Sequence, residues 1–231
     1  MKNQKQPKVV HIGAEIGAGL VMGIITVFAL IMLTKIIPYF PSYQPIDFLT
    51  TKTDQILSQV PFKWAFYIHI VSSWVVMVVG LGQFLPTIAK HKPTLHRLLG
   101  KLYIVFIIGL AAPSGLVLAQ YANGGLPAKV GFSMQCFVWW YITISAWQAI
   151  KHQKWQKHID QMIRSYAVTL AAMSLRVGSY MMIYYLGTKP IETYLTVTWL
   201  SWTLNLLIAE IIIQIGLSQW LLKIVHFKSV K

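Results

Sequence analysis

The sequence has a single cysteine, Cys136, and it lies inside an apolar run. One cysteine cannot form an intramolecular disulfide or a cysteine-based metal cluster, so we expect no such metal site and interpret Cys136 as a small core residue. The sequence also lacks the zinc-ligand motif HExxH and the nucleophile motif GxSxG. These absences argue against a membrane-embedded hydrolase, and the sequence leaves open whether the protein is an enzyme.

Charge is scarce, and negative charge is scarcest. Only 11% of the 231 residues are charged, 56% are hydrophobic, and the mean hydropathy is +0.58. A chain this apolar cannot leave its surface in water, so we expect the lipid bilayer as its surroundings. Six acidic residues against 20 Lys and Arg give a net charge of +14. Because the basic residues lie in short segments between apolar runs, membrane topology accounts for them and nucleic-acid binding is not expected.

No long polar or Pro/Gly/Ser-rich stretch divides the chain, so a single integral membrane domain over residues 1–231 is expected. Crossing the hydrocarbon layer as a helix takes about 20 apolar residues, because each residue rises about 1.5 Å. Six segments pass this test, at about residues 16–37, 64–85, 98–120, 130–150, 164–186 and 194–222. The predicted fold class is therefore all-α, a polytopic membrane helical bundle with six transmembrane helices.

The basic residues predict the orientation of the chain. One set of segments, the N-terminus, the loops after spans two and four and the C-terminal tail, carries Lys2, Lys5, Lys8, Lys90, Lys92, Arg97, Lys101, Lys151, Lys154, Lys157, Arg164, Lys223, Lys228 and Lys231. The alternate side carries only Lys35, Lys52, Lys63, Lys129 and Lys189. The positive-inside rule then predicts a multi-pass protein of a bacterial-type inner (cell) membrane with both termini in the cytoplasm.

Polar residues inside the predicted spans recur on one face of each helix, at about 100° per residue. The predicted stripes are His69, Ser73, Gly80 and Gln83 on span two, His96, Gly100, Tyr103 and Ser114 on span three, and His158, Ser165, Thr169, Arg176 and Tyr180 on span five. They predict a four-helix core of spans two to five around a polar interior, with spans one and six flanking it. Pro113 is expected to kink span three.

The depth of these residues suggests two groups. His69 and Arg176 are expected near the outer side, where they could share one ligand site, although Arg176 could equally be a structural charge bonded to backbone carbonyls. His96, His158, Arg97, Arg164, Gln83 and Glu210 are expected at the inner level. Glu210 is expected to pair with Arg164, Arg97 or a protonated histidine, and Asn205, about 140° away on the same helix, to make different contacts.

The chain also resembles a known family. The stretches that carry the resemblance are, in order, IHIVSSWVVMVVGLGQFLP, LHRLLGKLY, GFSMQCFVWWYITISAW, KHIDQMIRSYAVTLAAMSLR and LSWTLNLLIAE. Together they resemble a bacterial multi-pass membrane protein family, the domain of unknown function 2306, from about Trp64 to Glu210. The resemblance implies a fold but no activity. The polar positions that it picks out are His69, Gln83, His96, Arg97, Gly100, Tyr103, His158, Arg164, Arg176, Trp202, Asn205 and Glu210.

The first functional hypothesis is a membrane redox protein, associated with b-type haem or quinone, in which His96 and His158 bind the cofactor. Inward histidines of a membrane four-helix bundle are how such haems are held. A two-haem bundle would need a second histidine about four turns along the same helix, and after His69 that position holds Gln83. At most one haem with two histidine ligands therefore fits the sequence.

Two other hypotheses stay open. The protein could be a small transporter or binding protein for an anionic or lipid-like ligand, with Arg176 and His69 meeting the ligand. It could also be an accessory subunit whose polar stripes pair with helices of a membrane complex, or a homodimer. In both cases Gln83, Arg97, Tyr103, Arg164, Asn205 and Glu210 would form a ligand-binding or structural polar network.

Overall fold

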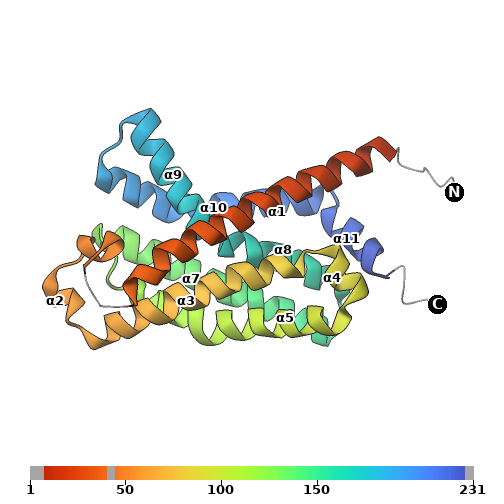
Figure 1. The fold of residues 1–231 in the computed structure, drawn as a ribbon, viewed down its shortest axis with the longest axis horizontal. Helices are drawn as coiled ribbons and strands as arrows, with labels where there is room; N and C mark the ends of the chain where they lie inside the picture. Colours follow the sequence, from red (N-terminus) through yellow and green to blue (C-terminus); the bar gives the residue numbers. More distant parts are fainter. Residues whose placement is uncertain (1–7, 41–44, 227–231) are drawn as a thin grey trace.

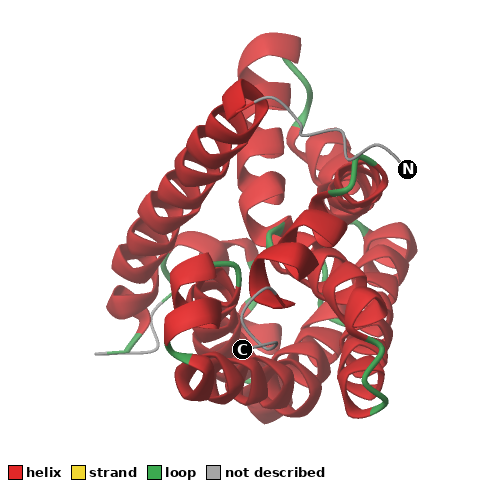
Figure 2. Ribbon diagram, turned by 90° about the vertical axis from the view of Figure 1, so that its right-hand side faces the viewer, coloured by secondary structure: helices red, strands yellow, loops and turns green. Residues whose placement is uncertain are grey.

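The computed structural model describes residues 8–40 and 45–226, and every regular element in these ranges is a helix (Figures 1 and 2). The long helices are α1 (Lys8–Ile36), α3 (Val60–Gln83), α5 (Pro93–Phe106), α7 (Gly125–Lys151), α8 (Trp155–Thr169), α9 (Ala171–Leu186) and α10 (Pro190–Gln214). The shorter ones are η1 (Ile37–Tyr39), η2 (Asp47–Thr51), α2 (Asp54–Leu57), α4 (Pro86–His91), η3 (Ile107–Ala111), α6 (Ala112–Ala119) and α11 (Leu217–His226). The predicted all-α class is confirmed.

Several helices are apolar enough to cross a membrane. By length and hydropathy, four stretches of the described chain qualify: Gly17–Tyr39, Val60–Gln83, Pro93–Ala119 and Pro190–Gln214. The pair α8 and α9 qualifies as a fifth if its bend of 44° lies within one span. Helix α7 has 27 residues, long enough to cross, but its tryptophan, serine, threonine and glutamine residues make it less apolar. The multi-pass helical fold is thus confirmed, whereas the count of six spans stays a prediction.

The helices define two ends of the bundle. In Figure 1, α4, α11, the start of α5 and the turn from α7 to α8 lie at one end, which we call the basic end. The segments η1, η2 and α2 lie at the opposite end, which we call the far end. Lys2, Lys5, Lys228 and Lys231, which entered the prediction of topology, lie outside the described residues. The cytoplasmic location of the basic end stays a prediction.

The buried core is built mainly by α3, α5 to α6, α7 and α8. Its fully buried members include Val76, Tyr103, Ile107, Ala146 and Val168, all at 1% exposure or less. Helix α1 adds Ile25 and Ala29, and Trp74 of α3 donates its indole N–H to the Ala29 carbonyl at 2.9 Å. Most other side chains of α1 from Gly17 to Ile36 are exposed, so this part of α1 flanks the core as an outer helix.

The fifth predicted span, 164–186, consists of two helices that meet at a bend. It begins earlier, at Trp155, and breaks at Leu170 between α8 and α9. The break frees the Ala167 carbonyl, which in a continuous helix would accept the N–H four residues on. Asn205 of α10 donates its amide Nδ2 to this carbonyl at 3.0 Å, and Ser174 of α9 donates its hydroxyl to Asn205 Oδ1 at 2.8 Å. One side chain from a neighbouring helix therefore satisfies both sides of the bend.

The sixth predicted span, 194–222, was also too long. Helix α10 ends at Gln214, and Gly216 with a φ of 91° turns the chain into α11. Such a φ is open to glycine without steric strain, which explains the break at this residue. Helix α11 then packs beside α8, where Gln156 Nε2 donates to the buried Ser218 hydroxyl at 2.7 Å. It is therefore an end helix of the basic end rather than part of a span.

At the far end, a buried lysine joins two loops. Lys52 is 8% exposed, and its Nζ donates to the Tyr121 carbonyl at 2.7 Å and to Asn123 Oδ1 at 2.9 Å. The same Nζ lies 5.0 Å from the centre of the Phe48 ring. Burial lowers the pKa of Lys52 to about 8 from an ordinary value of 10.5. The segment before α3 is thus tied to the turn between α6 and α7.

Replacing Lys52 with methionine should lower the free energy of unfolding by about 1–3 kcal/mol, because two carbonyl oxygens lose their donor. The wild type should also become more stable as pH rises from about 8 toward 10.5, since in that range the unfolded chain holds the lysine proton and the folded chain does not. Thermal unfolding in detergent between pH 7 and 10 measures both effects.

The matched control is Lys189→Met, which removes an exposed lysine at the end of the α9 to α10 loop. It should leave both the stability and the rise with pH unchanged. If the stability of Lys52→Met still rises with pH as much as that of the wild type, another titrating group causes the rise.

Candidate functional site

Two histidines lie at one level of the bundle, at the basic end. His96 lies in the first turn of α5 and His158 in the first turn of α8, and the two imidazoles are within electrostatic range of one another. Both helices start at the basic end and run in the same direction. Seven residues further along each, Tyr103 Oη and Ser165 Oγ are hydrogen-bonded at 3.0 Å. The equal spacing fixes the register and brings together the two histidines that the sequence placed at one level.

The helices that carry this pair stand on opposite sides of the core. Helix α5 packs against α3 and α7, and α8 packs against the same two helices. Four helices that contact one another in this cyclic order leave α5 and α8 as a diagonal pair. His96 and His158 therefore belong to two helices that lie diagonally across the core.

The His158 ring is fixed in one tautomer. Its Nδ1 lies 2.9 Å from the backbone carbonyl of Ala146 on α7. A carbonyl oxygen only accepts hydrogen bonds, so Nδ1 carries the proton and Nε2 keeps its lone pair. No sequence pattern could have identified this partner, because it is a main-chain atom of another helix.

The His96 ring is oriented by its backbone rather than by a hydrogen bond of its own. Its Nδ1 is buried and has no partner among the described residues. Gln83 of α3 donates Nε2 to the His96 carbonyl at 3.0 Å, which holds this turn of α5 against the end of α3. On α8, one turn beyond His158, Gln161 Oε1 is also buried without a partner. Buried polar atoms without partners are uncommon, and here two of them belong to the first two turns of α5 and α8.

Exposed cations lie on the same two helices. Arg97 and Lys157 are each next to a histidine in the sequence, and Lys101 lies five residues after His96 on α5. Arg164 is not free to bind another anion, because it is paired with Glu210. The described residues contain no group of three or more His, Cys, Asp or Glu side chains that could hold a metal ion.

A buried hydroxyl network lies directly beyond the histidines. Tyr103 Oη contacts Ser165 Oγ and, at 2.9 Å, Thr169 Oγ1, while Thr143 Oγ1 lies 2.8 Å from Ser165 Oγ. Tyr103, Thr143 and Ser165 are fully buried. Sequence reasoning picked out Tyr103 but missed Thr143, since an isolated threonine in an apolar span carries no periodic signal. The network ties α5, α7 and α8 together and keeps the bundle closed above the histidine pair.

His69 occupies a separate site further toward the far end. Its Nδ1 lies 2.9 Å from the Ala111 carbonyl, and its Nε2 lies 3.4 Å from Ser73 Oγ. Ala111 ends η3, a π-helical turn that directly precedes α6 and Pro113. Glycine at position 115 makes room for the ring, because a Cβ there would lie 2.9 Å from His69 Cε1. The irregularity expected at Pro113 therefore takes the form of a π turn next to a histidine.

Arg176 does not meet His69. It folds back on its own helix, where NH1 donates to the Ala172 carbonyl at 2.9 Å, and its side chain is exposed. The predicted inward stripe on span five was wrong beyond Thr169, because the bend at Leu170 rotates α9 away from the core and leaves Tyr180 63% exposed.

The two polar residues of α10 make different contacts, as their angular separation suggested. Of the three partners considered for Glu210, Arg164 is the one it contacts: Nε to Oε1 at 2.5 Å and NH2 to Oε2 at 2.8 Å. Asn205 instead bonds Ala167 and Ser174 at the bend. Both residues therefore clamp α10 onto α8 and α9.

Comparison with known proteins gives a family and no activity. A family model described as "Predicted membrane protein (DUF2306)" matches residues 66–213, which span α3 to α10 and hold both histidine sites. No curated protein and no solved structure matches the chain significantly. The family match covers well over half of the chain, and so this protein belongs to the DUF2306 family of predicted membrane proteins.

Proposed function

We propose that the protein is a membrane redox protein that binds one b-type haem at the basic end of the bundle, where His96 and His158 would hold it. The observation that carries the proposal is the equal spacing of these two histidines from the hydrogen bond between Tyr103 and Ser165, on two helices that run in the same direction. Membrane four-helix bundles hold haem between inward histidines in this way.

The hydrogen bonds of the two rings support this assignment. A histidine that ligates a metal commonly donates its second ring N–H to a backbone carbonyl, which fixes the ring and raises its basicity. His158 makes such a bond to the Ala146 carbonyl and keeps Nε2 for a ligand. His96 has a ring nitrogen without a partner, which is the chemistry that a bound metal or a polar cofactor edge would satisfy.

The charges at the basic end suit the same cofactor. Haem carries two propionates. Arg97 and Lys157 are next to the two histidines in the sequence, and Lys101 lies five residues after His96 on α5. When bound, the haem would supply reversible one-electron transfer between ferric and ferrous iron. The contribution of the chain would be to hold the two imidazoles, to neutralise the propionates and to exclude water through the hydroxyl network around Tyr103.

An ultraviolet-visible spectrum of protein purified from haem-replete cells tests the proposal. We expect a Soret band and reduced α and β bands at close to one haem per chain. His96→Ala and His158→Ala should each lose most of the haem, because a single remaining axial ligand holds it weakly. His91→Ala and His152→Ala are matched controls, since these exposed histidines lie in the adjacent basic loops and should keep full absorbance.

Two results would overturn the assignment. The first is a well-folded wild type that stays colourless although haem was available. The second is full haem content in both His96→Ala and His158→Ala, which would place the ligands elsewhere. Thermal unfolding of each variant in detergent separates loss of haem from loss of the fold.

A further inference from the structure

The four hydroxyls of the buried network form one continuous row between two backbone carbonyls. Thr143 Oγ1 donates to the Trp139 carbonyl at 2.8 Å and lies 2.8 Å from Ser165 Oγ. Tyr103 Oη follows, 3.0 Å from Ser165 Oγ and 2.9 Å from Thr169 Oγ1. Thr169 Oγ1 ends the row, because it lies 3.0 Å from the Ser165 carbonyl. All four side chains are at most 7% exposed, so the hydroxyls pair with one another rather than with solvent.

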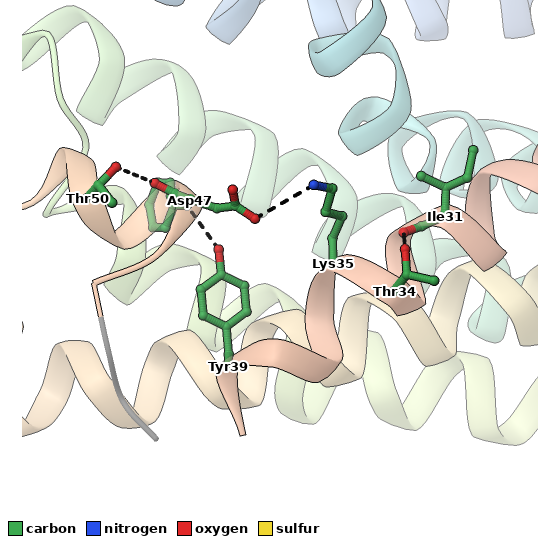
Figure 3. Close-up of polar contacts among 7 residues, drawn as sticks. Ile31, Thr34, Lys35, Tyr39, Asp47 and Thr50 are labelled. Atoms are coloured by element: carbon green, nitrogen blue, oxygen red, sulfur yellow. Dashed lines mark hydrogen bonds and ion pairs between the residues drawn. The ribbon is translucent and has the colours of Figure 1, made fainter. Parts of the chain in front are cut away.

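This row has one contact more than it has protons. Each hydroxyl carries one proton, and a carbonyl oxygen can only accept. Four protons therefore serve five contacts, so one contact always holds two oxygens without a proton between them. The hydroxyls of Thr34 and Thr50 differ, since each has one proton for one acceptor, the carbonyls of Ile31 and Asp47 (Figure 3). The missing proton is thus a property of the buried network and not of threonine hydroxyls in general.

The position of the unfilled contact sets the direction of the network. If the contact between Tyr103 and Thr169 is unfilled, Tyr103 donates to Ser165 and Ser165 donates to Thr143. If the contact between Thr143 and Ser165 is unfilled, Ser165 donates to Tyr103 and Tyr103 donates to Thr169. The two arrangements interconvert by rotation of two O–H bonds, and no proton leaves its oxygen. Because the dipoles of these two O–H bonds differ in direction, a change of charge nearby favours one arrangement over the other.

We propose that the hydroxyl network reverses its direction when the charge at the histidine pair changes. The network lies next to the pair: Thr143 precedes by three residues Ala146, whose carbonyl is bonded to His158, and Ser165 follows His158 by seven residues. The coupling to haem rests on the proposed function, in which each electron transfer changes the charge of the site by one. The missing proton follows from the hydrogen bonds alone, so it stands whether or not haem binds.

A double-mutant cycle in the purified full-length protein tests the missing proton. Thr143→Val or Thr169→Val removes an end hydroxyl with its proton and leaves three protons for three contacts, so each variant alone should lose little stability. The double variant leaves Tyr103 and Ser165 with two protons for one contact, and one buried donor then lacks an acceptor. Its loss in unfolding temperature should therefore exceed the sum of the two single losses by about half or more.

The matched control is a second cycle within the same network. Thr143→Val with Ser165→Ala leaves Tyr103 and Thr169 with two protons for two contacts, so these two losses should add. Residues in contact usually couple more strongly than residues apart. The missing proton predicts the reverse, because Thr143 and Ser165 are in contact and Thr143 and Thr169 are joined only through the other two hydroxyls.

A redox titration of the haem-loaded protein tests the response to charge. Thr169→Val permits only the arrangement that points toward Thr143, and Thr143→Val only the one that points toward Thr169. The two variants should therefore shift the midpoint potential in opposite directions relative to the wild type, because their fixed dipoles favour opposite charge states. Both replace threonine with valine, so a general effect of the substitution would shift both potentials in the same direction.

Each failure has its own meaning. Additive losses in the cycle of Thr143 and Thr169 would overturn the missing proton and with it the inference. Equal potentials, or shifts of the same sign, would overturn the response to charge. If the double variant does not fold, the potentials of the single variants decide. A well-folded wild type without haem would refute the proposed function and the coupling to it, and the two cycles would then decide the missing proton by themselves.

Discussion

Glu210→Leu is expected to lower the free energy of unfolding by about 3 kcal/mol, because it leaves the partly buried Arg164 guanidinium of α8 without its counter-ion. The estimate is at the low end for broken buried pairs, since the two side chains are 23% and 42% exposed. Both hydrogen bonds of the pair join α8 to α10, so the loss also loosens the contact between these helices. Thermal or denaturant unfolding in a defined detergent measures the effect.

The double variant Glu210→Leu with Arg164→Leu should recover stability to within about 1 kcal/mol of the wild type, because it leaves no charge behind and adds apolar contact. Glu192→Leu is the matched control on the same helix. Its carboxylate only caps the start of α10 through the Lys189 N–H at 3.1 Å, so the expected loss is below about 1 kcal/mol. A double variant as unstable as Glu210→Leu alone would refute the unpaired charge as the cause.

Gly80→Ala should destabilise the protein by about 2–3 kcal/mol through overpacking. A Cβ at position 80 would lie 2.5 Å from Cε2 of Tyr166 and 2.7 Å from Cε2 of Tyr103. Neither ring can move freely, because Tyr166 donates its hydroxyl to the Met77 carbonyl at 3.1 Å and Tyr103 is held by the hydroxyl network. The variant should therefore displace Tyr103 from Ser165 as well as strain the core.

Gly23→Ala on α1 provides a control of opposite sign. Nothing lies within 4 Å of a Cβ at that position, so alanine should stabilise the helix slightly, by up to about 1 kcal/mol. Comparing the two unfolding temperatures separates the steric effect from helix propensity. Equal shifts in both variants would contradict the close packing around Gly80.

The helical architecture could be predicted because a long apolar run is stable only in lipid, where the backbone must form a helix to satisfy its hydrogen bonds. The bend between α8 and α9 could not, since no proline or glycine marks it and the group that satisfies it, Asn205, lies on α10, 38 residues beyond Ala167. Without the bend, a helical wheel placed Arg176 and Tyr180 on the same inward face as Ser165. The prediction failed because a helical wheel assumes one constant helix axis, whereas the axis changes direction between α8 and α9.

The two histidines of the candidate site could be predicted from the sequence, but the groups that they contact could not. His96 and His158 could be placed at one level, because both follow basic loops at the start of a span. Their shared register depends on Tyr103 and Ser165, and the Nδ1 partner of His158 is a main-chain carbonyl. Lys52 was counted only as a loop charge, because a buried lysine that bonds backbone oxygens has no sequence signature.

The bend at Leu170 also has a consequence for the thickness of the bilayer. A straight continuation of α8 by the 16 residues of α9 would add about 24 Å of height, whereas a segment inclined at 44° adds about 17 Å along the same direction. Where α8 and α9 form one span, the exposed phenols of Tyr180, Tyr184 and Tyr185, which favour the level of the head groups, would lie closer to the midplane by this difference. We then expect the bilayer to be thinner beside α9 than on the other sides of the bundle.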